Sequence, residues 1–505
     1  MKHILILMTD QLRPDALGAY GNPYVQTPAL DAIAAESVIF DRAVTPSPVC
    51  VPARLSLLSG QYANRHGNSN NNPGLSYSGR GFYSMLTEAG FDSCCVGKMH
   101  HVWDRYGSLG FSRRDTQEEM SHPKDDYTKY IEENYPYVFD YNGQRSEMYY
   151  VPQVSQLPAE AHPTQWIGDR TVEFIENCDP EKPVFLMSSF IHPHPPFCPP
   201  APWNKLYRSD ELPAPFVPDD TRELKPLLHK TFDADRLGIS DLDALKLKNF
   251  YYACVSFVDY QISRITDALR RRGMYDDTAI LFISDHGECL GDYRNMGKRT
   301  MLSSASAIPF MLRVPGMPAG RRSDPVSLVD VAPTLLSLAG VHYDPAEFDG
   351  IDLFTGKHDI VYSQYNCHEK GVYMAAGETD KLIWHGPRRQ YYYFESSPET
   401  HDLYPSLCDS ARVRFLKEKL DAYVAADTGK PDAPVSGESS GWRPPFGVSR
   451  MDHTARRAEE AARIPEGYRI DLRRPIFDRI SQNSNSLADK YCPNVAAPIE
   501  FIRKN

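Results

Sequence analysis

Apolar runs alternate with longer amphipathic stretches over the first 340 residues, and this order predicts strands that alternate with helices. The short apolar runs predict buried strands at 3–9, 91–97, 184–191, 279–284 and 308–314. The amphipathic stretches predict helices at 28–37 (with Thr27 as its N-cap), 163–178, 240–272 and 328–339. We therefore expect an α/β fold in which helices flank a large mixed, mostly parallel sheet.

The pattern changes near residue 355, where aromatic and polar residues begin to alternate. The stretch KLIWHGPRRQYYYF (381–394) predicts a small antiparallel sheet, and a helix is expected near 410–425. Beyond Lys430 the chain is rich in Pro, Gly, Ser and Arg, with a short helical stretch near 453–463. We expect three parts: a large α/β domain over 1–355, a smaller α+β subdomain over 356–430, and an extended tail over 431–505 through which the chain forms a homo-oligomer.

Composition and charge narrow the class of partner. The chain has 505 residues, of which 41% are hydrophobic and 24% charged, as in globular proteins. The formal net charge of −11 argues against nucleic acid or an anionic membrane as a partner, because both require a basic surface. An anionic small substrate needs only a local cluster of positive groups, so it remains compatible with this charge.

The first residues, MKHILILMTD, predict a strand rather than an export signal. The apolar run at 4–8 is too short for a signal peptide, and Asp10 follows it at once. No stretch reaches the roughly 18 apolar residues that a membrane span needs. The ten cysteines show no metal-ligand or disulfide spacing. We therefore expect reduced thiols and a cytoplasmic protein.

Acidic residues and histidines follow three of the predicted strands. Asp10-Gln11 follows the first, His192-Pro193-His194 follows the strand at 184–191, and Asp285-His286 follows the strand at 279–284. The carboxyl ends of parallel strands meet at one edge of a sheet, so these groups can converge there. A single strand-end Asp is often only a helix cap, but Asp10, Asp285 and His286 together suggest a site for a hard cation.

Positive groups lie close to the same strand ends. PVCVPARLSLLSG (48–60) places Cys50 between two prolines at the start of a predicted helix, four residues before Arg54. Lys98 and His100 follow the strand at 91–97, and Lys298 follows Asp285-His286. Lys and Arg near a cation suit a tetrahedral oxyanion such as sulfate or phosphate.

Four motifs resemble those of the type I sulfatases of the alkaline phosphatase superfamily. They are CVPAR (50–54), GFDSCCVGKMH (90–100), PHPPF (193–197), and SDHGECLGDY (284–293) followed by Lys298. The resemblance runs in order from residue 4 to about residue 340. The segment SSPETHDLY (396–404) is also similar to the usual ending of the family. The resemblance implies an alkaline phosphatase-like fold and the hydrolysis of a sulfate monoester.

The resemblance also implies a modification of Cys50. In this family the motif cysteine is oxidised to formylglycine by a maturase that reads Pro52 and Arg54, and the aldehyde hydrate is the nucleophile. Arg54 then supports the hydrate electrostatically. One hydrate oxygen attacks sulfur, and deprotonation of the other lets the carbonyl reform and expel sulfate.

Further roles carry over residue by residue. Asp10, Asp285, His286 and the modified Cys50 would bind one divalent cation, which we expect to be Ca²⁺, with Mg²⁺ or Mn²⁺ as alternatives. Gln11 stands where many members have a second aspartate, so its role as a ligand stays open. The remaining roles are sulfate binding by Lys98 and Lys298, proton removal by His100, protonation of the leaving group by His194, and a structural role for His192.

The sequence differs from the family motifs at a few positions, and three other functions are compatible with parts of it. Val51, Ser59 and the pair Arg294-Asn295 differ from the usual motifs, but no reacting position is lost. Phosphonate monoester hydrolases and phosphodiesterases share the nucleophile and the metal, but place Tyr and Thr where this chain has Lys98 and His100. A two-zinc phosphatase would need a second set of ligands, and a non-catalytic binding protein with the same fold is a remote alternative.

The sequence does not choose among aryl, choline and sugar sulfates. The polar segment 64–80 either lines the pocket, with Asn71 as a candidate contact, or forms an ordinary surface loop. Segment 112–160, which is rich in Tyr, Asp and Glu, is a candidate for one wall of the pocket. A small ester that enters the cytoplasm is favoured over a polymer as the substrate.

Overall fold

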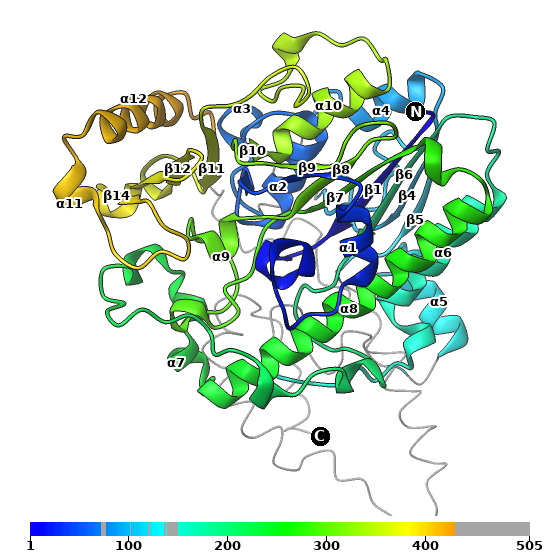
Figure 1. The fold of residues 1–505 in the computed structure, drawn as a ribbon, viewed down its shortest axis with the longest axis horizontal. Helices are drawn as coiled ribbons and strands as arrows, with labels where there is room; N and C mark the ends of the chain where they lie inside the picture. Colours follow the sequence, from blue (N-terminus) through cyan, green and yellow to red (C-terminus); the bar gives the residue numbers. More distant parts are fainter. Residues whose placement is uncertain (72–76, 102, 120–121, 136–137, 139–149, 430–505) are drawn as a thin grey trace, which may run out of the picture.

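An eight-stranded sheet crosses the molecule in the computed structural model, which describes residues 1–429 apart from 72–76, 102, 120–121, 136–137 and 139–149 (Figure 1). The strand order is β5 (Arg113–Thr116), β4 (Asp92–Gly97), β6 (Val184–Phe190), β1 (His3–Thr9), β7 (Thr278–Ser284), β8 (Phe310–Arg313), β2 (Val38–Phe40) and β9 (Gly320–Arg322). Neighbours from β5 to β7 are parallel, whereas β8 is antiparallel to both β7 and β2. The predicted mixed, mostly parallel sheet is confirmed.

Helices cover both faces of this sheet (Figure 1). One layer contains α1 (Pro28–Ala34), α5 (Asp126–Asn134), α6 (Pro163–Asn177) and α8 (Asp241–Arg271), and the other contains α2 (Cys50–Ser59), α4 (Phe82–Glu88) and α10 (Val331–Leu338). Strand β1 is apolar on both sides because it packs on both layers. Leu5 and Leu7 belong to the first core, and Ile4, Ile6 and Met8 belong to the second.

The ends of the long helices follow local sequence signals. The side chains of Ser240 and Asp243 form a capping box at the start of α8, which ends just before Gly273 with a positive φ of 68°. Thr27 is the N-cap residue of α1, as predicted, but its hydroxyl makes no capping hydrogen bond and accepts one from the Gly18 N–H instead. The carboxylate of Asp259 accepts hydrogen bonds from the first N–H groups of α1 in its place.

Helix α1 also ends three residues earlier than the predicted limit at 37. The Ser37 hydroxyl donates a hydrogen bond to the carbonyl of Ile33, and the chain turns into β2 at Val38. Shorter elements complete this part of the chain: β3 (Ala43–Val44), α3 (Ala63–His66), α7 (Ala234–Leu237), α9 (Ser303–Ser306) and β10 (Val326–Ser327).

A second sheet follows the body and confirms the predicted C-terminal subdomain with its antiparallel sheet. It contains β11 (Val361–Tyr365), β12 (Val372–Ala376), β13 (Lys381–His385) and β14 (Gln390–Phe394), and it is followed by α11 (Tyr404–Leu407) and α12 (Ala411–Ala425). One face packs on Met301 and Leu302 of the body, and the other packs under α12. The domain limits at 355 and 430 stay predictions.

The predicted tail over 431–505, with its helix near 453–463, lies outside the described residues, so oligomerisation through it stays a prediction. Of the helices in the described ranges, none combines the length and the apolar character that a membrane span requires. The nine cysteines in those ranges are free thiols, eight of them buried.

Candidate active site

The predicted site residues follow the ends of four neighbouring strands, at one edge of the large sheet. In the order β4-β6-β1-β7, the strand ends are followed by Lys98, His194, Asp10 and the pair Asp285-His286. Each of these side chains is at most 1% exposed. The convergence predicted from strand ends is therefore present, and the polar groups meet in the interior of the protein.

Helix α2 places Cys50 at the same edge. Cys50 is the first residue of the helix, and Pro52 lies in the first turn, where a missing N–H costs nothing. The Val49 side chain cannot cap the helix, but Asn71 Oδ1 accepts a hydrogen bond from the Val51 N–H at 3.0 Å. Asn71 therefore lies beside the Cys50 turn. The positive end of the helix dipole favours an anion at this position.

Cys50 lies within a compact group of possible metal ligands. One ligand atom each from Asp10, Cys50, Asp285 and His286 lies within 4.8 Å of the others. The Cys50 sulfur is 3.3 Å from His286 Nε2 and 4.0 Å from Asp10 Oδ1. His286 Nδ1 lies 3.0 Å from the Gly287 carbonyl oxygen, and donating to it leaves the Nε2 lone pair facing the group. Burial lowers the pKa of His286 to about 4, so the ring is neutral and able to bind a metal.

Arg54 holds the two carboxylates of this group. Its guanidinium donates to Asp285 Oδ2 at 2.9 Å and to Asp10 Oδ2 at 3.2 Å, and it also donates to the backbone carbonyl of Lys98 at 2.8 Å. One arginine on α2 therefore connects the ends of three strands. Burial alone raises the pKa of Asp10, but nearby positive groups, led by Lys98, outweigh it and hold this pKa well below its ordinary value.

Two lysines make the surroundings of Cys50 electropositive. Lys298 Nζ lies 2.9 Å from the Cys50 sulfur, and Lys98 Nζ forms an ion pair with Asp10. Burial and Asp10 raise the pKa of the Cys50 thiol, but Lys298 and Lys98 outweigh them, so the pKa lies below its ordinary value. The site therefore stabilises negative charge at residue 50.

Glu119 is a site residue that the sequence pattern did not single out. Its carboxylate forms an ion pair with Lys98 and lies 3.2 Å from His100 Nδ1 and 3.9 Å from His194 Nε2. It follows β5, a strand of only four residues that the hydropathy pattern did not predict. The rule that found Asp10 and Asp285, an acidic residue after a strand, would have found Glu119 if β5 had been recognised.

The neighbouring Glu118 shapes the loop that carries His100. Its carboxylate accepts hydrogen bonds from the Met99 and His100 N–H groups at 2.9 and 3.1 Å, and it pairs with Arg114 at 2.7 Å. These bonds hold His100 at a left-handed φ of 56°. Burial, together with Lys98, lowers the pKa of His100 well below its ordinary value, so its ring is neutral.

The two histidines after β6 have different surroundings. His194 Nδ1 lies 2.7 Å from the Pro195 carbonyl oxygen, and Nε2, which faces Cys50 and Glu119, makes no hydrogen bond within the described part of the chain. His192 instead faces Thr164 and Cys198. Its structural role stays a prediction, and its contacts lie outside the Cys50 group.

Gln11 lies beside Asp285 and contacts Glu288 through its amide nitrogen. With φ at 66°, its N–H donates to Asp285 Oδ1, and its side-chain Nε2 donates to Glu288. Its buried Oε1 makes no hydrogen bond with any residue that the structure describes. The role of Gln11 as a metal ligand therefore stays open.

The donor set fits one divalent cation. Asp10 and Asp285 supply carboxylate oxygens, which hard cations prefer, and His286 presents a neutral nitrogen. Residue 50 completes the group. Arg54 forms ion pairs with both carboxylates, and Lys98 forms an ion pair with Asp10. These positive side chains offset the negative charge of the two aspartates, which limits the net charge of the site.

The chain is similar to several known proteins. The family model described as Sulfatase matches residues 2–341. The arylsulfatase of Clostridium perfringens (strain 13 / Type A) is 29% identical over 451 residues, covering 83% of this chain and 92% of that protein. The choline-sulfatase of Rhizobium meliloti (strain 1021) is 28% identical over 372 residues, covering 70% of each. The solved phosphonate monoester hydrolase of Agrobacterium radiobacter has a TM-score of 0.72 at 21% identity, covering 84% of this chain and 96% of that one, which shows a shared fold.

Proposed function

The chain belongs to the sulfatase family, and we propose that it hydrolyses a sulfate monoester to an alcohol and sulfate, with Cys50 oxidised to formylglycine. The observation that carries the proposal is the position of Cys50. It begins a helix, lies beside two carboxylates and an imidazole, and is contacted by Lys298. An inert structural cysteine usually lies in apolar surroundings, without charged side chains in contact with its sulfur.

We further propose one divalent cation, Ca²⁺, held by Asp10, Asp285, His286 and residue 50. Oxidised residue 50 supplies an aldehyde hydrate as the nucleophile, and the cation supplies the positive charge that favours its deprotonated form. Arg54 fixes both carboxylates, as its hydrogen bonds indicate. The maturase that oxidises Cys50 is the proposed partner, and CVPAR is the segment it would recognise.

The remaining polar side chains suit sulfate transfer. Lys98 and Lys298 place two ammonium groups where the oxygens of a sulfate at residue 50 would lie. His194 points its free Nε2 at this position and is the proposed acid for the leaving oxygen. The neutral ring of His100 is the proposed base of the step that releases sulfate. Glu119 lies near both histidines, and its negative charge would stabilise the protonated form of either ring.

Sulfate esters are favoured over phosphonates because Lys98 and His100 occupy positions where phosphonate hydrolases place Tyr and Thr. We expect the purified enzyme to show a higher kcat/KM on 4-nitrophenyl sulfate than on 4-nitrophenyl phenylphosphonate, which has the same leaving group. A screen of aryl, choline and monosaccharide sulfates would then rank the substrates. A higher kcat/KM on the phosphonate than on every sulfate would contradict the proposal.

His194→Ala should separate substrates by their leaving groups. General acid catalysis contributes roughly 10²–10⁴-fold, and we expect a loss in this range for alkyl sulfates, whose alkoxide must be protonated. For 4-nitrophenyl sulfate the loss should be less than about tenfold, because nitrophenolate leaves without a proton. Steady-state kcat/KM values on both esters measure the effect.

The control for this experiment is His192→Ala. His192 contacts Thr164 and Cys198 rather than the Cys50 group, so its loss should lower activity on both esters by a similar factor. An equal loss on both esters with His194→Ala would show that His194 is not the acid.

A further inference from the structure

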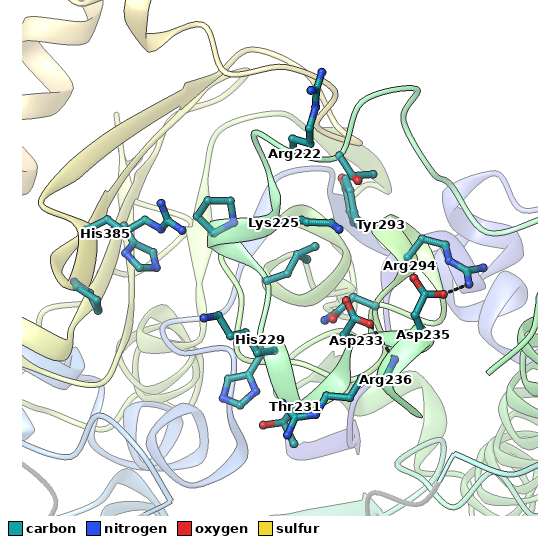
Figure 2. A pocket seen from close by; sticks show the side chains of 17 residues that line it. Arg222, Lys225, His229, Thr231, Asp233, Asp235, Arg236, Tyr293, Arg294 and His385 are labelled. Carbon is teal, nitrogen blue, oxygen red and sulfur yellow. Dashed lines mark hydrogen bonds and ion pairs between the residues drawn. The ribbon is translucent and has the colours of Figure 1, made fainter. Parts of the chain in front are cut away.

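A cavity of about 780 Å³ lies between the large domain and the small sheet (Figure 2). Its lining comes from segment 221–236, from residues 293–295, and from the end of β13 with the turn after it. Figure 2 shows Lys225 and His229 reaching into this space from the first segment, while His385 comes from the small sheet. A volume of this size is typical of a small-molecule site.

The lining of the cavity is strongly basic. Its basic side chains outnumber its two aspartates, Asp233 and Asp235, and they are Arg222, Lys225, Lys230, Arg236, Arg294 and Arg388. Asp235 forms an ion pair with Arg294, and the Asp233 carboxylate accepts a hydrogen bond from the backbone of Arg236. The lining alone has an excess of four positive charges, and two of its arginines, Arg222 and Arg294, are also paired with Asp220 and Asp241 just outside it.

Several of these cations lack a partner. Lys225, Lys230, Arg236 and Arg388 form no ion pair with any residue in the described ranges, whereas Arg222 pairs with Asp220 just outside the lining. Two histidines of the lining, His229 and His385, each have a buried Nδ1 atom that makes no hydrogen bond with the described residues. The four cations are exposed to solvent, and they lie around one concave space, where their ammonium and guanidinium groups can bind an anion together.

The cavity is attached to the loop that carries Lys298. Asp233 and Asn295 pair as a β-bridge, and the Met296 N–H donates to the Phe232 carbonyl at 2.8 Å. Asn295 lies in the lining, and three residues of chain span at most about 11 Å, so the lining approaches Lys298 closely. Lys298 in turn contacts Cys50. The cavity and the Cys50 group are therefore connected through one short stretch of chain, 295–298.

We propose that this cavity binds a second anionic group, a sulfate or a carboxylate, carried on the alcohol part of the substrate. The inference rests on the proposed sulfatase function and specifies its substrate class as a polyanionic sulfate ester. A cationic alcohol such as choline would be repelled by the same lining.

The test compares two sugar esters that differ in one charge: glucosamine N,6-disulfate and N-acetylglucosamine 6-sulfate. Wild-type enzyme should show at least about a tenfold lower KM for the disulfate. Calorimetric titration of the inactive Cys50→Ala protein with each ester measures binding without turnover and should show the same preference. Inorganic sulfate that binds as tightly as the disulfate would assign the cavity to a free anion and overturn the proposal.

The double variant Lys225→Gln/Arg388→Gln should remove this preference, while kcat/KM on 4-nitrophenyl sulfate stays within about twofold of wild type. Lys419→Gln/Arg389→Gln is the matched control, because it removes the same charges at positions that are equally exposed but lie outside the lining. Turnover of both sugar esters without any preference, or a preference that survives the double variant, would contradict the role of the cavity. Preferential binding without turnover of any sulfate ester would contradict the sulfatase function alone.

Discussion

Asp285→Asn should remove the bound divalent cation and lower sulfatase turnover by about 10³-fold or more. Asp285 is one of two carboxylates in the group around Cys50, and an amide is a much weaker ligand for a hard cation. Stabilisation of charge by a metal is worth several kcal/mol, and each 1.4 kcal/mol corresponds to about a tenfold change in rate. Elemental analysis of the purified variant and kcat/KM on 4-nitrophenyl sulfate measure the two effects.

The matched control is Asp380→Asn, which also removes a buried carboxylate from an arginine. Asp380 pairs with Arg412 at 2.6 Å in the C-terminal subdomain. This variant should lose stability, because Arg412 is left without its partner, but should keep its metal and its activity per folded molecule. Thermal unfolding of both variants separates loss of fold from loss of metal. An Asp285→Asn protein that keeps its cation, or wild-type enzyme with two stoichiometric zinc ions, would contradict the proposed metal site.

Cys50→Ala should have the larger effect on turnover, a loss on the order of 10⁴-fold or more, because it removes the side chain that becomes the nucleophile. The fold should survive, since alanine is a good helix former at the first position of α2 and the contacts of Arg54 are unchanged. Circular dichroism and kcat/KM on aryl and alkyl sulfates measure the two outcomes.

Cys254→Ala is the control for this loss. Cys254 is also buried, but it lies on α8 and belongs to no group of possible metal ligands that the structure describes. Its substitution should cost some stability and leave turnover near the wild-type value. Comparable activity in the two variants would show that residue 50 is not the nucleophile.

The part of the site that sequence patterns predict is the part built on regular strands. Runs such as HILILMT in β1 are apolar on both faces, and the polar residue after each run marks the edge where a ligand binds. Asp10, Lys98 and Asp285 follow from this rule alone. Cys50 and Arg54 were found differently, from the spacing of a motif on the first turns of α2.

The features that the sequence pattern does not predict depend on contacts between distant residues, and such contacts leave no periodic hydrophobic pattern in the sequence. Glu119 follows β5, whose sequence RRDT has no apolar run because it is an edge strand. The cap of α1 comes from Asp259, which is more than two hundred residues away in the sequence. The basic cavity likewise combines loop residues from two segments with the end of the small sheet, so only the fold brings its charges together.

Peptide mass spectrometry of active enzyme tests the central claim most directly. The account predicts that the peptide containing Cys50 carries an aldehyde or its hydrate in place of the thiol. The modified fraction should follow specific activity when the chain is produced in hosts with and without the maturase. Enzyme with full activity whose Cys50 peptide carries only the unmodified thiol would contradict the account.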